Sequence, residues 1–280
     1  MNLKRFVFLC SILLTFSSRS VFSQGYKVKT IVIDAGHGGD KPGAAGSYSL
    51  EKNIALQVAL KLGRKFEEDM PDVKILYTRK TDTDVSLYRR AEIANNAKAD
   101  LFIAIHCNSM PDTRAVTGYS KKHGKKIPKY SYVKDKSTSG TETFVAGSHR
   151  LNEQDGAIRE NADISLEKDY KKNYDGYDPK DPETFIILSL FKNTYRDKSL
   201  KLARLIQNNY THDNHRGNRG VKEQGILVLQ RCGLPSVLTE IGFISNPVEE
   251  DYMNSASGQA EIVNAIFKAV KTYKRETEVN

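Results

Sequence analysis

Residues 31–39 read Ile-Val-Ile-Asp-Ala-Gly-His-Gly-Gly, and this stretch predicts both the fold class and the position of a site. Its three β-branched residues show no polar alternation, which is typical of a strand buried on both faces of a sheet. The glycines on either side of His37 let the backbone turn sharply and leave the imidazole open to a ligand. Loops at the ends of buried strands are where open α/β sheets place their sites. On this stretch alone, a tight turn whose histidine bonds a neighbour is an equally good interpretation.

The first 23 residues have the pattern of a secretory signal peptide. Lys4 and Arg5 precede an apolar run, residues 6–16, that is too short to span a bilayer. A small residue at position 23 predicts cleavage before Gln24, and Cys10 lies inside the apolar run, which argues against a lipoprotein. No later stretch reaches the roughly 18 apolar residues of a membrane helix. We therefore expect an exported protein, located in the periplasm, with no transmembrane segment in its mature form.

The net charge and the cysteine content exclude few classes of function. The formal charge of +9 falls to +6 when the leader, with three basic and no acidic residues, is removed. Such an excess suits an anionic partner such as a cell-wall polymer or a membrane surface, although many ordinary soluble proteins carry as much. Cys107 and Cys232 remain in the mature chain. Both lie near apparent strand ends, where buried thiols are common, and we expect them to be unpaired.

Helix and strand patterns alternate through the rest of the chain. Ser49 can cap a helix that runs to about Phe66, with a buried stripe at i+4 spacing. Further helices are predicted over residues 86–95, 186–190, 200–206 and 262–273, and further strands over residues 73–78, 99–105, 140–145, 221–229 and 234–240. This order predicts a single α/β domain over residues 24–280, a three-layer sandwich whose mostly parallel or mixed central sheet is flanked by helices. Residues 111–139 are lysine-rich and short of apolar side chains, which predicts a loop. They lack the aromatic pattern of a nucleic-acid platform, so we expect no nucleic-acid partner.

Three more polar residues fall where they could join His37. Glu51 lies in the first turn of its predicted helix on the inward face, where it can stabilise the helix dipole or ligate a metal. His106 follows its strand as His37 follows the first, so both imidazoles are expected at one edge of the sheet and could share an ion. Glu240 ends a third strand at the same edge. Two imidazoles and one carboxylate form a ligand set of catalytic zinc sites, and a second carboxylate could accept a proton from water, which favours amide hydrolysis.

Five segments carry a resemblance to a known family: residues 31–39, 51–62, 87–95, 99–109 and 235–247. They resemble the zinc-dependent N-acetylmuramoyl-L-alanine amidases of the AmiC type, in the Amidase_3 family, and the similarity covers most of the mature chain. The resemblance implies a mixed sheet flanked by helices and cleavage of the amide between N-acetylmuramic acid and the first L-alanine of the peptidoglycan stem peptide. It also implies one Zn²⁺ per chain held by His37, Glu51 and His106, with Glu240 as the catalytic residue. We expect a monomer.

Some members of this family carry a helical insertion that covers the active site until an activator protein displaces it. Residues 146–210 supply extra, charged chain in a comparable place. We hypothesise that residues 152–177 include a helix lying over the metal, with Glu160 or Glu167 at the open zinc position. A thin apolar stripe would dock it: Ala157, Ile158, Ala162, Ile164 and Leu166. A solvated loop without contact to the site is the alternative.

Two rival functions remain open. A zinc carboxypeptidase or endopeptidase would apply similar metal chemistry to the stem peptide itself. A non-catalytic wall-binding protein on the same fold would be expected to lose at least one of the four site residues, and the sequence keeps all four.

Overall fold

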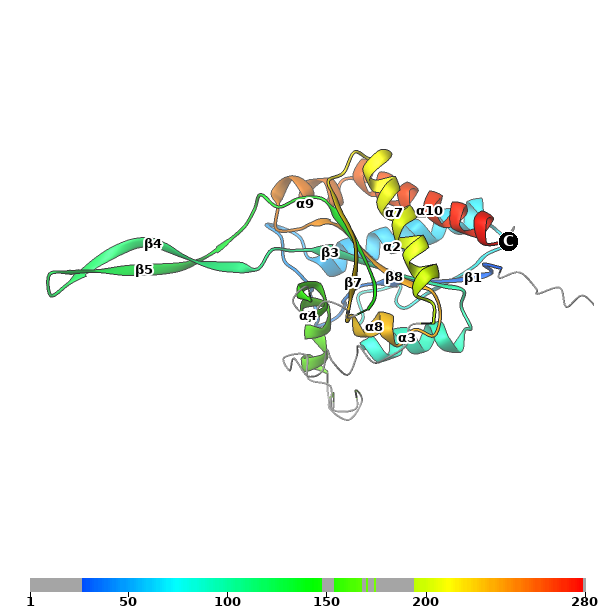
Figure 1. Ribbon diagram of the computed structural model, residues 1–280, viewed down its shortest axis with the longest axis horizontal. Coiled ribbons are helices and arrows are strands. Elements are labelled where there is room, and N and C mark those ends of the chain that lie inside the picture. Colours follow the sequence, from blue (N-terminus) through cyan, green and yellow to red (C-terminus); the bar gives the residue numbers. More distant parts are fainter. Residues whose placement is uncertain (1–26, 148–153, 168–169, 171–173, 175–193, 279–280) are drawn as a thin grey trace, which may run out of the picture.

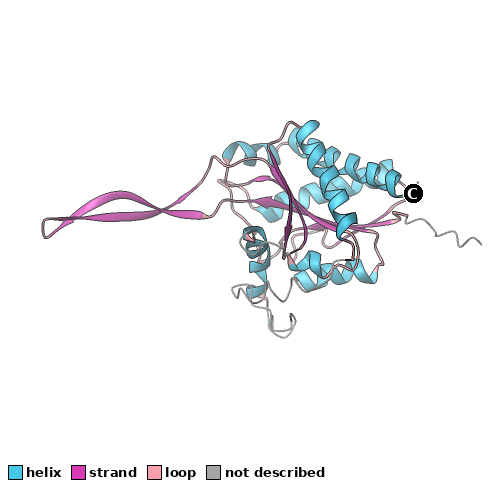
Figure 2. Cartoon of the chain, in the orientation of Figure 1, coloured by secondary structure: helices cyan, strands magenta, loops and turns pink. Residues whose placement is uncertain are grey.

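The structure is a computed structural model that describes residues 27–147, 154–167, 170, 174 and 194–278 (Figure 1). Helices and strands alternate along much of the chain, as Figure 2 shows. In chain order the elements are β1 (Thr30–Ala35), α2 (Glu51–Asp69), β2 (Lys74–Tyr77), α3 (Leu87–Asn96), β3 (Leu101–Asn108), β4 (Asp112–Lys122), β5 (Lys125–Lys134), β6 (Thr141–Ala146), α4 (Asp155–Asn161), the 3-10 helix η1 (Ala162–Leu166), α7 (Arg196–His212), β7 (Asn218–Gln224), α8 (Leu227–Gln230), β8 (Ser236–Phe243), α9 (Pro247–Asn254) and α10 (Ala256–Glu278).

Six strands form one mixed sheet in the order β2-β1-β3-β8-β6-β7. The first four are mutually parallel, whereas β6 runs antiparallel to β8 and pairs in parallel with β7. β1, β3, β6 and β8 are buried almost throughout because they lie inside the sheet with a covering layer on both faces. The mixed sheet predicted from the sequence is confirmed.

Helices cover both faces of the sheet and complete three layers (Figure 1). α2, α7 and α10 pack together on one face, where alternate residues of the central strands, such as Ile31 and Ile33, join the larger apolar cluster. α3 and α8 cover the other face, where Val32 and Phe102 join a second cluster. Cys107 belongs to the first cluster and Cys232 to the second, so the sheet separates the two thiols; both are free, as expected.

Residues 111–139 are not the loop that the sequence predicts. β4 and β5 form a two-stranded antiparallel hairpin that projects from the body of the molecule (Figure 1). The turn between the strands is His123-Gly124, both with positive φ (49° and 77°), which is the backbone of the tight hairpin turn that matches strand twist. The prediction failed because both faces of the hairpin are exposed to solvent, so no buried apolar face reveals the strand periodicity.

Other boundaries differ in smaller ways. The predicted strand 221–229 divides at Gly225 into β7 and the short helix α8. α2 begins at Glu51 with Leu50 as a cap that makes no side-chain bond; Ser49 instead donates to Glu250. The leader, its cleavage site and the predicted helix 186–190 lie outside the described residues. Within the described part of the chain, no helix is both long and apolar enough to cross a membrane.

Candidate metal centre

Strand register brings three polar side chains side by side across the sheet. His106 of β3 pairs with Glu240 of β8, and Glu240 pairs in turn with Glu142 of β6. Along their strands they alternate in step with Phe102 and Leu238 of the second apolar cluster, so their side chains point to the face that α3 and α8 cover. The carboxyl ends of the parallel strands thus supply a histidine and a glutamate to one place, as the sequence predicts.

The loop after β1 delivers His37 to the same place in a conformation that few residues adopt. His37 has φ 55°, in the left-handed region, and Arg90 holds it there by donating to its carbonyl oxygen at 2.6 Å. Arg79 donates to the carbonyl of Gly36 at 2.7 Å. A Cβ on Gly36 would lie 2.4 Å from the His106 ring, so only glycine lets the two imidazoles approach. Their ring centroids are 4.9 Å apart.

Glu51, at the first residue of α2, bridges the two histidines. Its Oε1 lies 3.2 Å from Nε2 of His37 and 3.0 Å from Nδ1 of His106. The backbone N–H of Cys107 donates to Oε1, and that of Ala44 donates to Oε2. These bonds fix the carboxylate, whose charge also suits the positive end of the helix dipole. The sequence left the choice between a dipole role and a ligand role open, and the position of Glu51 accommodates both.

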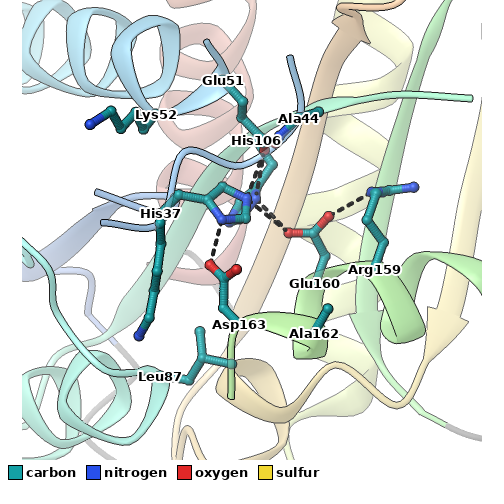
Figure 3. Close-up of polar contacts among 12 residues, drawn as sticks. His37, Ala44, Glu51, Lys52, Leu87, His106, Arg159, Glu160, Ala162 and Asp163 are labelled. Atoms are coloured by element: carbon teal, nitrogen blue, oxygen red, sulfur yellow. Dashed lines mark hydrogen bonds and ion pairs between the residues drawn. The ribbon is translucent and has the colours of Figure 1, made fainter. Parts of the chain in front are cut away.

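A fourth carboxylate enters from α4 (Figure 3). Glu160 Oε2 lies 2.6 Å from Nδ1 of His106 and 3.6 Å from Nε2 of His37. The neighbouring Arg159 donates from Nε to Glu160 and, at 2.6 Å, from Nη2 to Oε1 of Glu240. One turn of helix therefore contacts both the histidine pair and the glutamate on β8.

Carboxylates make both imidazoles strongly basic. Burial lowers the pKa of His37, but the carboxylates of Glu51 and Asp163 outweigh burial and raise it to about 10. Burial opposes protonation of His106 as well, yet Glu160 and Glu51 hold its pKa well above the ordinary value. Asp163 of η1 lies 2.7 Å from Nδ1 of His37 and so orients that ring with Nε2 toward the cluster.

The two glutamates that contact Arg159, Glu160 and Glu240, have pKa values shifted in opposite directions. Burial raises the pKa of Glu160, but His106 and Arg159 overcome it and bring the pKa down to about 2. Burial raises the pKa of Glu240 to about 8, because Arg159 offsets only part of the desolvation and Glu160 adds repulsion. Pairs of carboxyl groups whose pKa values diverge in this way are typical of acid–base sites.

The residues present fit a metal ion. One ligand atom from each of His37, Glu51, His106 and Glu160 lies within 4.8 Å of the others, and all four residues are buried. Within the described chain, His37 Nε2 and Glu160 Oε2 have no partner in hydrogen-bond geometry although both are buried. Buried polar atoms are rarely left without a partner, and here they converge on one point. Imidazole and carboxylate donors of this kind are those that zinc accepts.

Comparison with known proteins agrees with this geometry. The family model described as "N-acetylmuramoyl-L-alanine amidase" (Amidase_3) matches residues 31–272. The chain belongs to this family. It is accordingly a cell-wall amidase with a His/Glu group suited to a metal ion, and the family acts on peptidoglycan outside the cytoplasm.

Individual relatives of this amidase span several bacteria. The N-acetylmuramoyl-L-alanine amidase AmiC of Escherichia coli O6:H1 is 29% identical over 87% of the chain, which spans only 52% of the length of AmiC. A putative N-acetylmuramoyl-L-alanine amidase of Buchnera aphidicola is 28% identical over 87% of this chain and 94% of its own. Among solved structures, AmiC2 of Nostoc punctiforme shares the fold, with a TM-score of 0.60, 21% identity and coverage of 90% and 99% of the two chains.

The amidase site contains residues that the sequence did not single out. Arg159 and Asp163 arrive through the docking of α4 and η1, which depends on tertiary packing and leaves no local signal. The sequence predicts no role for Asp34. Burial raises the pKa of this carboxyl group, yet the Arg90 guanidinium at 2.6 Å and the Thr78 hydroxyl bring it below the ordinary value. An aspartate at the end of a buried strand, three residues before the glycine-flanked histidine, indicates that a buried cation lies behind the loop.

Of the two glutamates proposed for the open metal position, the structure brings only Glu160 to the cluster. Glu167 lies apart from it and accepts hydrogen bonds from Lys41 at 3.1 Å and from Tyr174 at 2.7 Å. The apolar stripe is also only partly buried: Ala157 and Ile164 are enclosed, whereas Ile158 and Leu166 are 49% and 65% exposed.

Proposed function

We propose that this chain is a zinc-dependent amidase that cuts the bond between N-acetylmuramic acid and the first L-alanine of the stem peptide. His37, Glu51 and His106 hold one Zn²⁺ per chain, and Glu240 acts as the catalytic acid and base. The observation that carries the proposal is the buried convergence of the four donors beside Glu240. When bound, the zinc supplies a Lewis acid that polarises the scissile carbonyl and makes water a better nucleophile.

Glu240 is suited to move the proton of this reaction. Its Oε2 is buried and lacks a hydrogen-bond partner among the described residues, so one oxygen is free to accept a proton from the attacking water. The protonated acid can then deliver that proton to the leaving amine nitrogen. Hydrogen bonds from the backbone N–H groups of Ala44 and Cys107 fix Glu51, so this ligand needs no reorganisation during the reaction.

We propose that α4 closes this site to substrate. Glu160 fills the fourth position around the histidines, and Arg159 neutralises Glu240 by its ion pair. A cavity of about 10 Å³ remains between His37, His106, Glu160 and Asp163, which is room for about one water. A muramyl peptide cannot enter while α4 stays in place.

Polar contacts rather than the apolar stripe hold α4 on the sheet. The backbone N–H of Ala157 donates to Gln224, and Asn161 bonds both the carbonyl of Gly225 and the N–H of Leu227. Each buried bond of this kind contributes about 0.5–1.5 kcal/mol, so the total lies within reach of a binding partner. We therefore propose that an activator protein competes for this segment.

The proposed insertion is shorter than residues 146–210. α7, from Arg196, buries Leu202, Ala203 and Ile206 against the sheet and α10, so it belongs to the covering layer of the body. The regulatory part then lies between Ala146 and Arg196. We further propose a signal peptide over residues 1–23, one catalytic domain over 24–280, a periplasmic location, the AmiC subtype and a monomeric state with no nucleic-acid partner.

Product analysis tests the reaction. Purified peptidoglycan should be digested with the zinc-loaded Arg159→Ala/Glu160→Ala chain, in which the α4 contacts are removed, and with the same chain carrying Glu240→Gln, and the released fragments weighed by mass spectrometry. The amidase releases intact stem peptides with a free L-alanine amine, and the Glu240→Gln digest lacks them. Shortened or cross-bridge-cleaved stem peptides would instead indicate the carboxypeptidase or endopeptidase. Binding without any products, in a variant whose α4 contacts are removed, would indicate a wall-binding protein.

A further inference from the structure

The hairpin of β4 and β5 is built unlike the rest of the chain. Among the described elements, each of its strands packs extensively only against the other, and Figure 1 shows both extending away from the sheet and helices. Its aromatic residues are exposed: Tyr119 by 64%, Tyr130 by 49% and Tyr132 by 74%. A two-stranded hairpin has no core of its own and is marginal in water, so neither its length nor its tyrosines are explained by stability.

The pairing register gathers all three tyrosines on one face. Tyr130 and Tyr132 are two residues apart on β5 and so point the same way, as does Pro128. Tyr119 of β4 lies opposite Pro128 and therefore joins them. It does so because the register shifts between Val116 and Gly118; without that bulge the alternation would send Tyr119 to the other face.

Cations interleave with the tyrosines on that face. Arg114 faces Tyr132 across the strands and stacks over the ring of Tyr130 at 3.8 Å, and Lys126 lies 6.0 Å from the ring centre of Tyr119. We call this surface the tyrosine face; it consists of Arg114, Tyr119, Lys121, Lys126, Tyr130 and Tyr132. The opposite face carries Lys122, Lys125 and Lys129 with no aromatic residue.

The charge of the hairpin selects an anionic partner and opposes a second copy of itself. Residues 112–134 hold seven lysines and arginines and one aspartate, a net charge of +6. Lysines along exposed edge strands are a common means of preventing edge-to-edge pairing, because two such edges repel. Tyrosine rings offer flat apolar area with a polar tip, which suits the C–H face of a sugar ring, and the cations suit carboxylates.

The base of the hairpin lies at the rim of the metal centre. β4 follows β3, the strand that carries His106, after a connection of three residues. Lys134, at the other end of the hairpin, donates to the carbonyl of Ala45, one residue beyond the Ala44 N–H that holds Glu51. A polymer lying along the hairpin would therefore reach the site with its next repeat.

We propose that the tyrosine face binds the glycan strand and stem-peptide carboxylates of peptidoglycan next to the repeat that is cleaved. Sugar rings stack on Tyr119, Tyr130 and Tyr132, and the carboxylates pair with the interleaved Arg114, Lys121 and Lys126. This inference rests on the proposed function, because it takes the polymer to be the substrate.

Binding is measured separately from hydrolysis by co-sedimentation of the full-length Glu240→Gln chain with purified, insoluble peptidoglycan. Replacing the three tyrosines together by alanine should weaken binding about tenfold or more. Arg114→Ala/Lys121→Ala/Lys126→Ala should weaken it similarly and remove most of its salt dependence. The matched control Lys122→Ala/Lys125→Ala/Lys129→Ala removes as many charges from the opposite face and should change binding less than threefold. Unchanged thermal melting shows that each variant folds.

Four results would overturn the proposal: unchanged binding of the tyrosine variant, equal losses for the two cation triples, tighter binding to phosphatidylglycerol vesicles than to peptidoglycan, or a dimer that only the tyrosine variant abolishes. Equal losses for the two cation triples would show that the hairpin binds by bulk charge attraction. Tighter binding to vesicles would show that its partner is a membrane surface, and a dimer would show that it pairs with a second copy of the chain. The proposed function has a separate test. It fails when the Arg159→Ala/Glu160→Ala enzyme, with Glu240 intact, yields no stem peptides from the same polymer.

Discussion

α4 and the β4–β5 hairpin are both charged segments that interrupt the α/β pattern, yet they end in opposite environments. α4 lies on the sheet with Ala157, Glu160 and Asn161 buried, whereas almost every residue of the hairpin is at least partly exposed. The difference comes from what each segment meets. α4 presents buried carboxylate and amide groups to partners of complementary charge, and the hairpin presents cations to solvent. A charged composition alone therefore does not distinguish a segment that closes a site from one that reaches outward.

The largest expected effect is on hydrolysis and zinc binding, from changes to the residues directly beneath α4. Replacing Glu240 by glutamine keeps its shape but removes the general base, so hydrolysis should fall about 100-fold or more while zinc stays bound. His37→Ala and His106→Ala should each lose most of the zinc, since a three-ligand site tolerates no missing ligand. Initial rates on peptidoglycan and elemental analysis of bound zinc measure both. Loss of zinc from the Glu240→Gln variant would show that Glu240 is a zinc ligand rather than the general base.

The second effect tests whether α4 closes the site. Arg159→Ala/Glu160→Ala removes two charge-assisted contacts, each worth about 1.5–3 kcal/mol, and should raise the basal rate about tenfold or more. Ile158→Ala is the control, because that side chain lies on the same helix and is 49% exposed. Rates are compared on purified peptidoglycan without any added protein. A rate that stays level or drops in the folded double variant would mean that α4 is no barrier, or that Glu160 serves the reaction.

A third, smaller effect concerns the loop beneath the hairpin base. Glu250 accepts hydrogen bonds from the backbone N–H groups of Ser47, Tyr48 and Ser49, and these lower its pKa although burial opposes the shift. Glu250→Gln should cost about 1–3 kcal/mol at pH 7, a few degrees in Tm. Because the folded pKa is depressed, the contribution exists above the unfolded pKa of about 4.5 and disappears as pH falls through the folded value.

Thermal melting of wild type and Glu250→Gln at pH 7, 5 and 3 checks this linkage. The gap between the two Tm values should be widest at pH 7 and should narrow as pH falls, because the folded pKa of Glu250 is depressed. A gap that widens on acidification would contradict the assigned direction. Asp251→Asn, one residue away and exposed, is the control for a general change in surface charge.

The smallest expected effect is on thermal stability, from removal of the hairpin. Replacing residues 113–133 by a short Gly/Ser turn should shift Tm by no more than about 2 °C, because these side chains bury almost nothing against the body. Backbone hydrogen exchange should agree, with fast exchange in β4 and β5 and slower exchange in α4. A drop of 5 °C or more would show that the hairpin is part of the folded core and would remove the contrast with α4.

The sequence predicts the sheet, its covering helices and the meeting of His37, Glu51 and His106, because buried strands have distinctive composition and their carboxyl ends converge at one edge. It does not predict the hairpin, because both faces of β4 and β5 are exposed to solvent and no run of buried apolar residues marks either strand. The His123-Gly124 pair was an unused signal of a tight turn. Arg159 could not be found, because its proximity to Glu240 depends on where α4 docks.

The path of the chain through α4 has a consequence for control. α4 lies in the connection from β6 to β7, two strands paired in the same sheet, so the segment is tethered to the body at both ends. A displaced α4 stays at an effective concentration in the millimolar range, set by its tethers and independent of how much enzyme the cell makes. If α4 closes the site as proposed, an activator must therefore remain bound for the enzyme to stay open. On this proposal, inhibition returns once the activator dissociates, without proteolysis, resynthesis or any second protein.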